Sequence, residues 1–385
     1  MSVLTKRNEK ATKGKTPDAL ASSDSHIIEP ADLWQKRIDS RFKARAPQVV
    51  VEGSTDQWYA DGSIFHTVRG TSYQAGVRFD HPDLLSLKGR MEAVRPGALD
   101  PNLHVKDMDL DGVAAAVLYP TVGLQLFRIP DFDLLSASVR AYNDYVAEFC
   151  KAHPHRLKGI ALLNVDSIEG AVSELKRAAK MGFAGAMIPV GPYVRYDNPS
   201  YEPLWAEAES LGIPLSLHVA TNRWLPDMDT REPLDPVVFS ARGQDLRISI
   251  AALIFSGAFE RHPQLKIVST EFEISWAAYL LVRMDDTYKH RVAGIKGRRF
   301  KTGLPSDFFR QNVFISFQED ALGIQLRHSF GVDRLMWGAD YPHAESTFPR
   351  SREIVDRIFK GVPEEEKIKI TRENTVKLYN FSASA

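Results

Sequence analysis

The sequence predicts an α/β protein built as a closed (β/α)8 barrel with a long insertion after the first strand. Eight short apolar segments can be read along the chain, and patterns typical of amphipathic helices separate most of them. Apolar runs without alternation are typical of strands that are buried on both faces, as in parallel sheets covered by helices. No Gly-x-Gly-x-x-Gly motif follows the first strand, so a TIM barrel is favoured over a doubly wound open sheet.

The composition is that of a globular protein with an ample core, 44% hydrophobic and 25% charged. Lys plus Arg and Asp plus Glu both number 49, so no net charge favours binding to nucleic acid or to a membrane surface. No apolar stretch approaches the roughly 18 residues of a membrane-spanning helix. Residues 1–21 lack the apolar segment of a secretory signal and are predicted to be a disordered tail. We therefore expect a cytoplasmic protein that acts on a small molecule.

The barrel is expected to occupy residues 22–385, and its first strand carries Asp24 and His26. Residues 31–102 then form a long, irregular insertion that Gly and Pro interrupt repeatedly. An insertion of this length inside a compact domain usually has a function or makes an oligomer contact. We expect a lid or arm beside the site, or a dimer interface, and we expect the protein to be a homodimer.

From residue 103 the chain becomes regular. The remaining strands are expected at 112–119, 159–163, 185–188, 213–218, 265–271, 312–316 and 333–340. Helices are expected at about 132–152, 168–181, 201–211, 236–261 and 274–291, with two more helical segments after the last strand.

Polar side chains stand at the ends of four of these strands. Asp24 and His26 end the first strand, His218 the fifth, Glu271 the sixth and Asp340 the eighth. Each has an ordinary structural explanation when it is taken alone: a core histidine, an ion-paired glutamate or a capping aspartate. The carboxyl ends of barrel strands meet at one mouth, however, and carboxylates and imidazoles are ligands of divalent metals. Together these residues predict a metal site.

Four further residues are candidates for contact with the substrate. Arg223, five residues after His218, is the nearest cation that could hold a substrate carboxylate. Trp224 and Tyr119 could form the wall of an apolar pocket, and His343 could contact either the substrate or the metal. Taken alone, a loop arginine such as Arg223 is more often a surface charge, and plain packing is the simpler explanation of the two aromatic residues. His343 could also hold a metal ligand in place without touching the metal or the substrate.

An ordered set of motifs resembles one known family. The set comprises DSHIIEP at 24–30, KDMDLDGV at 106–113, SLH at 216–218, FSGAFERHP at 255–263 and WGADYPH at 337–343. It is similar to the amidohydrolase-related branch of the amidohydrolase superfamily, which includes aminocarboxymuconate-semialdehyde decarboxylase. The resemblance runs from about Ser22 to Phe381. It implies a metal-dependent barrel in which Asp24, His26, His218 and Asp340 hold the ion, and in which Asp340 also handles the proton of a metal-bound water.

The chain departs from the decarboxylase pattern at Glu271, where those relatives carry a histidine. It also has no lysine on the fourth strand that could be carbamylated to bridge two metals. We therefore expect a metal-dependent hydrolase in which a metal-bound hydroxide cleaves an amide, ester or thioester, with Asp340 and Glu271 as catalytic residues. Non-oxidative decarboxylation of an aromatic or enoic acid is the alternative, and a non-catalytic binding barrel is a remote one. The expected cofactor is one divalent ion of Fe, Mn or Zn, with a second ion held by Glu271 and His343 as the other option.

Overall fold

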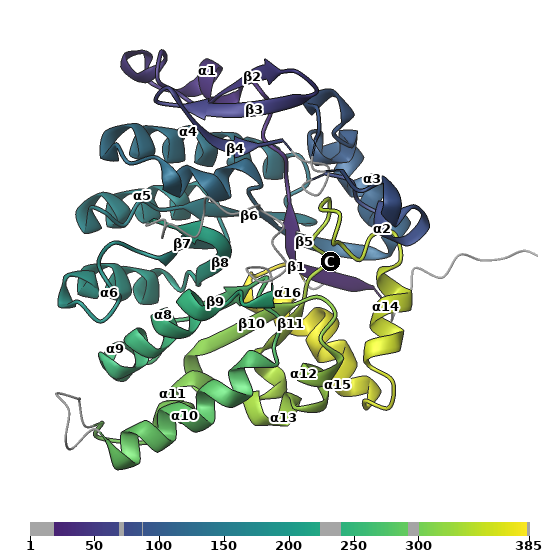
Figure 1. Ribbon diagram of the computed structural model, residues 1–385. Helices are drawn as coiled ribbons and strands as arrows, with labels where there is room; N and C mark the ends of the chain where they lie inside the picture. Colours follow the sequence, from purple (N-terminus) through teal and green to yellow (C-terminus); the bar gives the residue numbers. More distant parts are fainter. Residues whose placement is uncertain (1–18, 69–72, 87, 224–239, 292–299, 383–385) are drawn as a thin grey trace, which may run out of the picture.

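The computed structural model describes residues 19–68, 73–86, 88–223, 240–291 and 300–382. Eight parallel strands, paired in the order β1-β5-β6-β7-β8-β9-β10-β11, form the barrel, and helices cover its outer face (Figure 1). The strands are β1 (Leu20–His26), β5 (Val113–Tyr119), β6 (Leu157–Leu162), β7 (Gly185–Gly191), β8 (Leu215–Asn222), β9 (Ile267–Thr270), β10 (Val313–Phe317) and β11 (Leu335–Trp337). The predicted fold class is confirmed. Residues 20 and 21 were expected in the tail but begin the first strand, and residues 1–18 lie outside the described range.

Capping residues and glycines mark where several of the helices between the strands begin and end. The helices are α3 (Pro101–Asp111), α4 (Phe132–Lys151), α5 (Ile168–Met181), α6 (Glu202–Leu211), α8 (Gln244–Phe255), α9 (Ala258–Arg261), α10 (Trp276–His290), α11 (Pro305–Asn312), α12 (Ala321–Gln325), α13 (Arg327–Phe330), α14 (Ser351–Ile358), α15 (Glu364–Ile368) and α16 (Asn374–Leu378). Asp131 and Ser167 cap α4 and α5 by accepting hydrogen bonds from backbone N–H groups of the first turn. Gly182 and Gly212 end α5 and α6 in the left-handed conformation that glycine adopts without strain.

One expected helix is interrupted. Residues 236–261 were predicted to be a single helical region, but α8 ends at Phe255 and α9 begins at Ala258. Gly257, at φ +76°, lies between them in a conformation that a continuous helix does not allow. Residues 236–239 of the expected helix fall outside the described range. No helix within the described residues is both long and apolar enough to cross a membrane.

The barrel closes between its first strand and the segment that follows its last one. The Asp340 N–H donates to the Asp24 carbonyl (2.8 Å), and the His26 N–H donates to the Tyr341 carbonyl (2.6 Å). The Ser23 hydroxyl donates to the Trp337 carbonyl across the same seam. Two segments that are more than 300 residues apart in sequence therefore meet edge to edge at the mouth of the barrel.

The insertion is more regular than we expected. It contains α1 (Leu33–Arg37), a three-stranded antiparallel sheet of β2 (Gln48–Glu52), β3 (Thr55–Ala60) and β4 (Ser63–Thr67), and the short α2 (Val77–Asp80). The sheet lies above α4 in Figure 1. Trp34, whose ring meets Trp58 edge-on, donates its indole N–H to the Ser138 carbonyl of α4. The sequence signal for the hairpin is Asp61-Gly62, because both residues take the positive φ that a tight hairpin turn requires.

The far end of the insertion lies beside the barrel mouth. Arg78 of α2 donates to the Ser346 carbonyl (3.0 Å), and Arg350 pairs with Asp80 (2.7 Å). These contacts join α2 to the loop that follows β11. The insertion thus reaches the mouth, while its predicted roles as a lid or a dimer arm stay predictions.

Candidate metal centre

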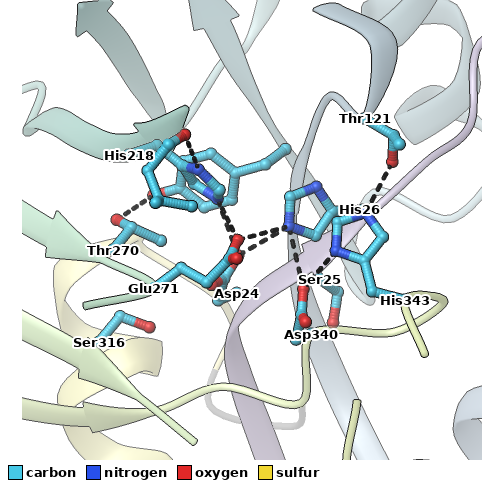
Figure 2. A network of polar contacts seen from close by, with 12 residues as sticks. Asp24, Ser25, His26, Thr121, His218, Thr270, Glu271, Ser316, Asp340 and His343 are labelled. Atoms are coloured by element: carbon cyan, nitrogen blue, oxygen red, sulfur yellow. Dashed lines mark hydrogen bonds and ion pairs between the residues drawn. The ribbon is translucent and has the colours of Figure 1, made fainter. Parts of the chain in front are cut away.

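Five side chains from four parts of the barrel converge at its mouth (Figure 2). They are Asp24, His26, His218, Glu271 and Asp340, the five residues predicted from the strand ends. His26 Nε2 lies 3.4 Å from Asp24 Oδ1, 3.3 Å from Asp340 Oδ1 and 3.9 Å from Glu271 Oε2. His218 Nε2 lies 3.3 Å from Glu271 Oε2 and 3.7 Å from Asp24 Oδ1. The structure therefore brings all five predicted ligands together.

Local backbone structure explains why these side chains meet. Asp24 and His26 are two residues apart on β1, so both point to the same face of the strand. Glu271 follows β9 and Asp340 follows β11, and both take positive φ values, +66° and +56°. A positive φ is costly for a residue with a side chain and persists only where the surroundings enforce it, most often at functional sites. The two carboxylates are thus turned into the mouth by the backbone itself.

Each histidine in the cluster has one ring nitrogen fixed by a backbone carbonyl. His26 Nδ1 lies 2.7 Å from the Pro120 carbonyl, and His218 Nδ1 lies 3.0 Å from the Val219 carbonyl. A carbonyl can only accept, so the proton of each neutral ring resides on Nδ1. The lone pair of Nε2 is then directed into the cluster, which is the arrangement found for histidines that bind metals.

The atoms that face the centre have no hydrogen-bond partner among the described residues. This holds for Asp24 Oδ1, His26 Nε2, His218 Nε2, Glu271 Oε2 and Asp340 Oδ2, all of which are buried. Buried polar atoms without partners are rare because each costs free energy. Asp24, His26, His218 and Glu271 have ligand atoms within 4.8 Å of one another, and Asp340 lies in a second group that shares His26 and Glu271. Such carboxylates and imidazole lone pairs fit a divalent cation with mixed oxygen and nitrogen ligands. The residues present therefore fit the metal that the sequence predicts.

His343 lies beside His26 and Asp340, on the side of the cluster away from His218 (Figure 2). With His26, Glu271 and Asp340 it forms a second group whose ligand atoms lie within 4.8 Å of one another. Its Nδ1 lies 2.7 Å from Asp340 Oδ1, and its ring lies 4.1 Å from that of His26. Two overlapping ligand groups are compatible with either one or two ions, so the second ion stays a prediction.

The hydroxyl of Thr121 determines which nitrogen of His343 carries a proton. This hydroxyl donates to the Ile27 carbonyl (2.8 Å), which uses its only hydrogen. It can therefore only accept from His343 Nε2, 3.1 Å away, and Nε2 must carry a hydrogen. The 2.7 Å contact between Nδ1 and Asp340 then requires a further proton, shared by the imidazole and the carboxylate.

Burial and mutual repulsion separate the pKa values of the acidic groups. Burial raises the pKa of Glu271 well above its usual value, and the negative charges of Asp340 and Asp24 raise it further. Burial acts in the same direction on Asp340, but His343 and His26 outweigh it and hold the pKa of Asp340 well below the usual value. Asp24 also has a lowered pKa because hydrogen bonds to His218 and His26 outweigh its burial. In the metal-free cluster, Glu271 is therefore the carboxyl group that is most easily protonated.

The residues predicted to contact the substrate have different surroundings. Arg223 is buried, and its guanidinium bonds to Asp166 and to the carbonyls of Phe127 and Ile129. This geometry anchors the end of β8 to the segments after β5 and β6, and the contact of Arg223 with a substrate carboxylate stays a prediction. Trp224 lies outside the described residues.

Tyr119 is fully buried inside the barrel. Its hydroxyl lies 2.7 Å from Ser216 Oγ, and its ring lies 5.1 Å from that of His218. Burial raises the pKa of this phenol to about 12. Tyr119 therefore supports the ligand His218, and its contact with a substrate stays a prediction.

Two supporting residues were not predicted from the sequence. Thr121 stands two residues after Tyr119, and nothing in its local pattern indicates a contact with His343. Glu29 is fully buried, and its carboxylate accepts hydrogen bonds from the N–H groups of Val122 and Gly123, each at 2.8 Å. These bonds hold the segment around Thr121 against the end of β1. Glu29 could have been found from the sequence because it belongs to the DSHIIEP motif.

Comparisons with known proteins agree with this geometry. The chain is 27% identical over 311 residues to a gamma-resorcylate decarboxylase of Rhizobium sp. (strain MTP-10005), covering 73% of this chain and 87% of the relative. An amidohydrolase from Mycobacterium avium subsp. paratuberculosis K-10 superposes with a TM-score of 0.80 at 22% identity, covering 94% and 99% of the two chains. A dihydroxybenzoic acid decarboxylase from Polaromonas sp. JS666, solved with bound manganese and 2-nitroresorcinol, gives a TM-score of 0.63 at 20% identity, covering 94% and 97%.

These relatives overturn one expectation. The predicted cleavage of an acyl bond by metal-bound hydroxide is wrong, because the related sequences are decarboxylases rather than hydrolases. That expectation depended on Glu271, which does belong to the cluster, but in a chain whose related sequences are decarboxylases. Residues 101–381 match the sequence profile of the family described as Amidohydrolase. The chain is therefore an enzyme of the amidohydrolase family, with a metal-competent cluster at the mouth of its barrel.

Proposed function

We propose that this protein is a metal-dependent, non-oxidative decarboxylase of a small hydroxylated aromatic acid. The observation that carries the proposal is the set of five buried ligand atoms without partners, in a chain related to gamma-resorcylate decarboxylases. The manganese in the Polaromonas decarboxylase supports Mn²⁺ as the first ion to test, with Fe²⁺ and Zn²⁺ after it. The expected cytoplasmic location and homodimer stay predictions.

The reaction needs an anchored carboxylate and a proton. A divalent ion bound by Asp24, His26, His218, Glu271 and Asp340 would supply a Lewis acid that holds oxygens of the substrate. Loss of carbon dioxide leaves the electron pair of the broken carbon–carbon bond on the ring carbon, which must then take up one proton.

The pair of Asp340 and His343 is suited to deliver that proton. The two side chains share a proton across 2.7 Å, and Thr121 fixes the imidazole so that its Nδ1 faces the carboxylate. Asp340 Oδ2 is one of the buried atoms that would hold the ion, so the shared proton lies on the side of Oδ1, next to the metal and to a substrate bound there. In this proposal the proton that His343 Nδ1 shares with Asp340 Oδ1 passes to the ring carbon, and Asp340 relays it while its own pKa stays low. A general acid of this kind contributes about 10²- to 10⁴-fold to a rate.

The test is release of carbon dioxide from gamma-resorcylate (2,6-dihydroxybenzoate) by protein reconstituted with Mn²⁺. Asp340→Asn keeps the size of the side chain but cannot donate a proton as an acid, so we expect it to lower kcat at least about 100-fold. Asp133→Asn, in the first turn of α4, is the matched control and should keep full activity. Absence of carbon dioxide release from gamma-resorcylate and from a panel of other hydroxybenzoates would reject the proposal.

A further inference from the structure

Helix α3 directs two carboxylates toward the loop that carries Asp340 and His343. Asp107 and Asp111 are four residues apart on this helix, so both lie on one face of it. They belong to the KDMDLDGV motif, to which the proposed reaction gives no role. Each carboxylate bonds to a different end of the loop after β11.

The first contact reaches the residue next to Asp340. The Tyr341 hydroxyl donates to Asp107 Oδ2 at 2.5 Å. Arg95 binds the same carboxylate with two N–H groups, Nε to Oδ2 at 2.7 Å and Nη2 to Oδ1 at 2.5 Å. The carboxylate is thus fixed from one side by a guanidinium and presents its oxygen to the phenol from the other.

Close packing leaves this contact little freedom. A Cβ atom on Gly97 would lie 2.5 Å from the Tyr341 hydroxyl and closer still to the Asp107 carboxylate, so only glycine fits there. The Tyr341 ring meets His104 edge-on at 5.1 Å and Phe348 at 5.0 Å. The ring, its hydroxyl and the acceptor are therefore all held in one geometry.

The second contact fixes the far end of the loop. Asp111 accepts hydrogen bonds from the Ser351 N–H (3.0 Å) and from the Ser351 hydroxyl (2.5 Å). The Ser351 hydroxyl lies 2.7 Å from the Thr347 hydroxyl, and the Thr347 N–H donates to the Ala339 carbonyl (2.9 Å). This chain of bonds leads back to the residue before Asp340.

From these contacts we propose that α3 positions the metal-binding and catalytic carboxylate: Asp107 fixes Tyr341, and Tyr341 sets the orientation of Asp340. Asp340 takes a φ of +56°, a backbone conformation that is costly for any residue other than glycine. The contacts to residues on both sides of Asp340 enforce this conformation. Asp107 is therefore a positioning residue that acts through Tyr341, and its effect on turnover, though not on metal binding, rests on the proposed function.

The test uses Tyr341→Phe, which removes one hydroxyl and leaves the ring packing and the pair of Arg95 and Asp107 in place. We expect the dissociation constant for Mn²⁺, measured by electron paramagnetic resonance, to rise about 10-fold, the effect typical of losing a residue that orients a ligand. The kcat for gamma-resorcylate should fall by a similar factor when Mn²⁺ is saturating, with a smaller change in KM. Asp107→Leu removes the acceptor together with the pair to Arg95 and should give at least the same defects. Adding Tyr341→Phe to it should cause no further loss, because the hydroxyl acts only through that carboxylate.

Two matched controls test whether the effect is specific. Tyr201→Phe removes a hydroxyl that donates to the Val194 carbonyl (2.7 Å), away from the cluster. Asp109→Asn neutralises the exposed carboxylate between Asp107 and Asp111 on α3, which pairs with Arg156. Both controls should leave Mn²⁺ affinity and kcat within about twofold of the wild-type values, a difference of about 0.4 kcal/mol.

The outcomes separate this inference from the proposed function. Weaker Mn²⁺ binding in Tyr341→Phe, in a protein that decarboxylates none of the test acids, would support the positioning role and reject the proposed reaction. A lower melting temperature with unchanged Mn²⁺ affinity and kcat would show a purely structural role and overturn the inference. Additive losses in the double variant would overturn it as well.

Discussion

Replacing Glu271 by Gln should have opposite effects on the metal-free and the metal-loaded protein. The Glu271 side chain is 12% exposed, and its ligand atom lies within 4.8 Å of those of Asp24 and of Asp340. At an effective dielectric constant of about 20, each of these repulsions costs about 3.5 kcal/mol or more. Without the metal, Asp24 and Asp340 outweigh burial and raise the pKa of His26, and the protonated ring at 3.9 Å contributes about 4 kcal/mol of attraction. The net repulsion is about 3 kcal/mol. Removing the charge should therefore stabilise the metal-free protein by about 1–4 kcal/mol.

The dependence on pH follows from the raised pKa of Glu271. A carboxyl group whose folded pKa lies above its usual 4.5 keeps its full contribution to stability below about pH 4.5. That contribution is lost as the pH rises toward the folded pKa. The metal-free wild type should lose stability as the pH rises from about 5 to 8, and Glu271→Gln should lose less.

Thermal and urea unfolding of chelator-treated protein at pH 5.5 and at pH 8 measure these effects, and Mn²⁺ titration measures the ligand role. With Mn²⁺, we expect Glu271→Gln to bind the ion at least about 10-fold more weakly than the wild type. Glu273→Gln is the matched control, because the Glu273 carboxylate accepts hydrogen bonds from the N–H groups of Gln318 and Glu319. The Glu273→Gln variant should be less stable than the wild type with or without the ion, and its affinity for Mn²⁺ should be unchanged. A metal-free Glu271→Gln that is less stable than the wild type at pH 8 would refute the reasoning.

Three more predictions concern the surroundings of the cluster. Thr121→Val keeps the shape of the side chain but removes the acceptor for His343 Nε2, so kcat should fall about 10-fold with little change in KM; an unchanged kcat in steady-state assays would contradict the proton-sharing arrangement. Arg223→Met leaves Asp166 without its buried partner, so urea unfolding should show a loss of about 3–5 kcal/mol, and a loss under about 1 kcal/mol would contradict the anchoring role. Removing divalent ions should lower the melting temperature, and Mn²⁺ at about 100 times its dissociation constant should restore about 2.7 kcal/mol, whereas a melting temperature that does not respond to Mn²⁺ would reject the site.

The barrel and its ligands could be predicted because both depend on short-range patterns. Unbroken apolar runs identify strands buried on both faces. The common geometry of such strands brings His218 and Asp340 to one mouth although 121 residues separate them in the chain. The hairpin at Asp61-Gly62 also had a local signal, but it was missed because residues 31–102 were interpreted as one irregular insertion.

Contacts between distant side chains could not be predicted. Arg223 and Asp166 are 57 residues apart, and nothing in the sequence near Arg223 indicates that it pairs with a buried carboxylate. The same is true of Thr121 and His343, which meet across 222 residues. The reaction was mispredicted for a different reason. The ligand types determine which ions bind, whereas the bond that breaks depends on how a substrate is held and on where a proton is stored.

The seam of the barrel has a consequence for how the enzyme is assembled. The first ligands, Asp24 and His26, lie on the first strand, while Asp340 lies beyond the last one, and backbone bonds join the two segments. A nascent or truncated chain that stops before Asp340 carries most of the ligands but lacks both the closing bonds and the final carboxylate. Tight metal binding at the predicted site would therefore require a chain that extends through Asp340 and a closed seam between β1 and the segment after β11.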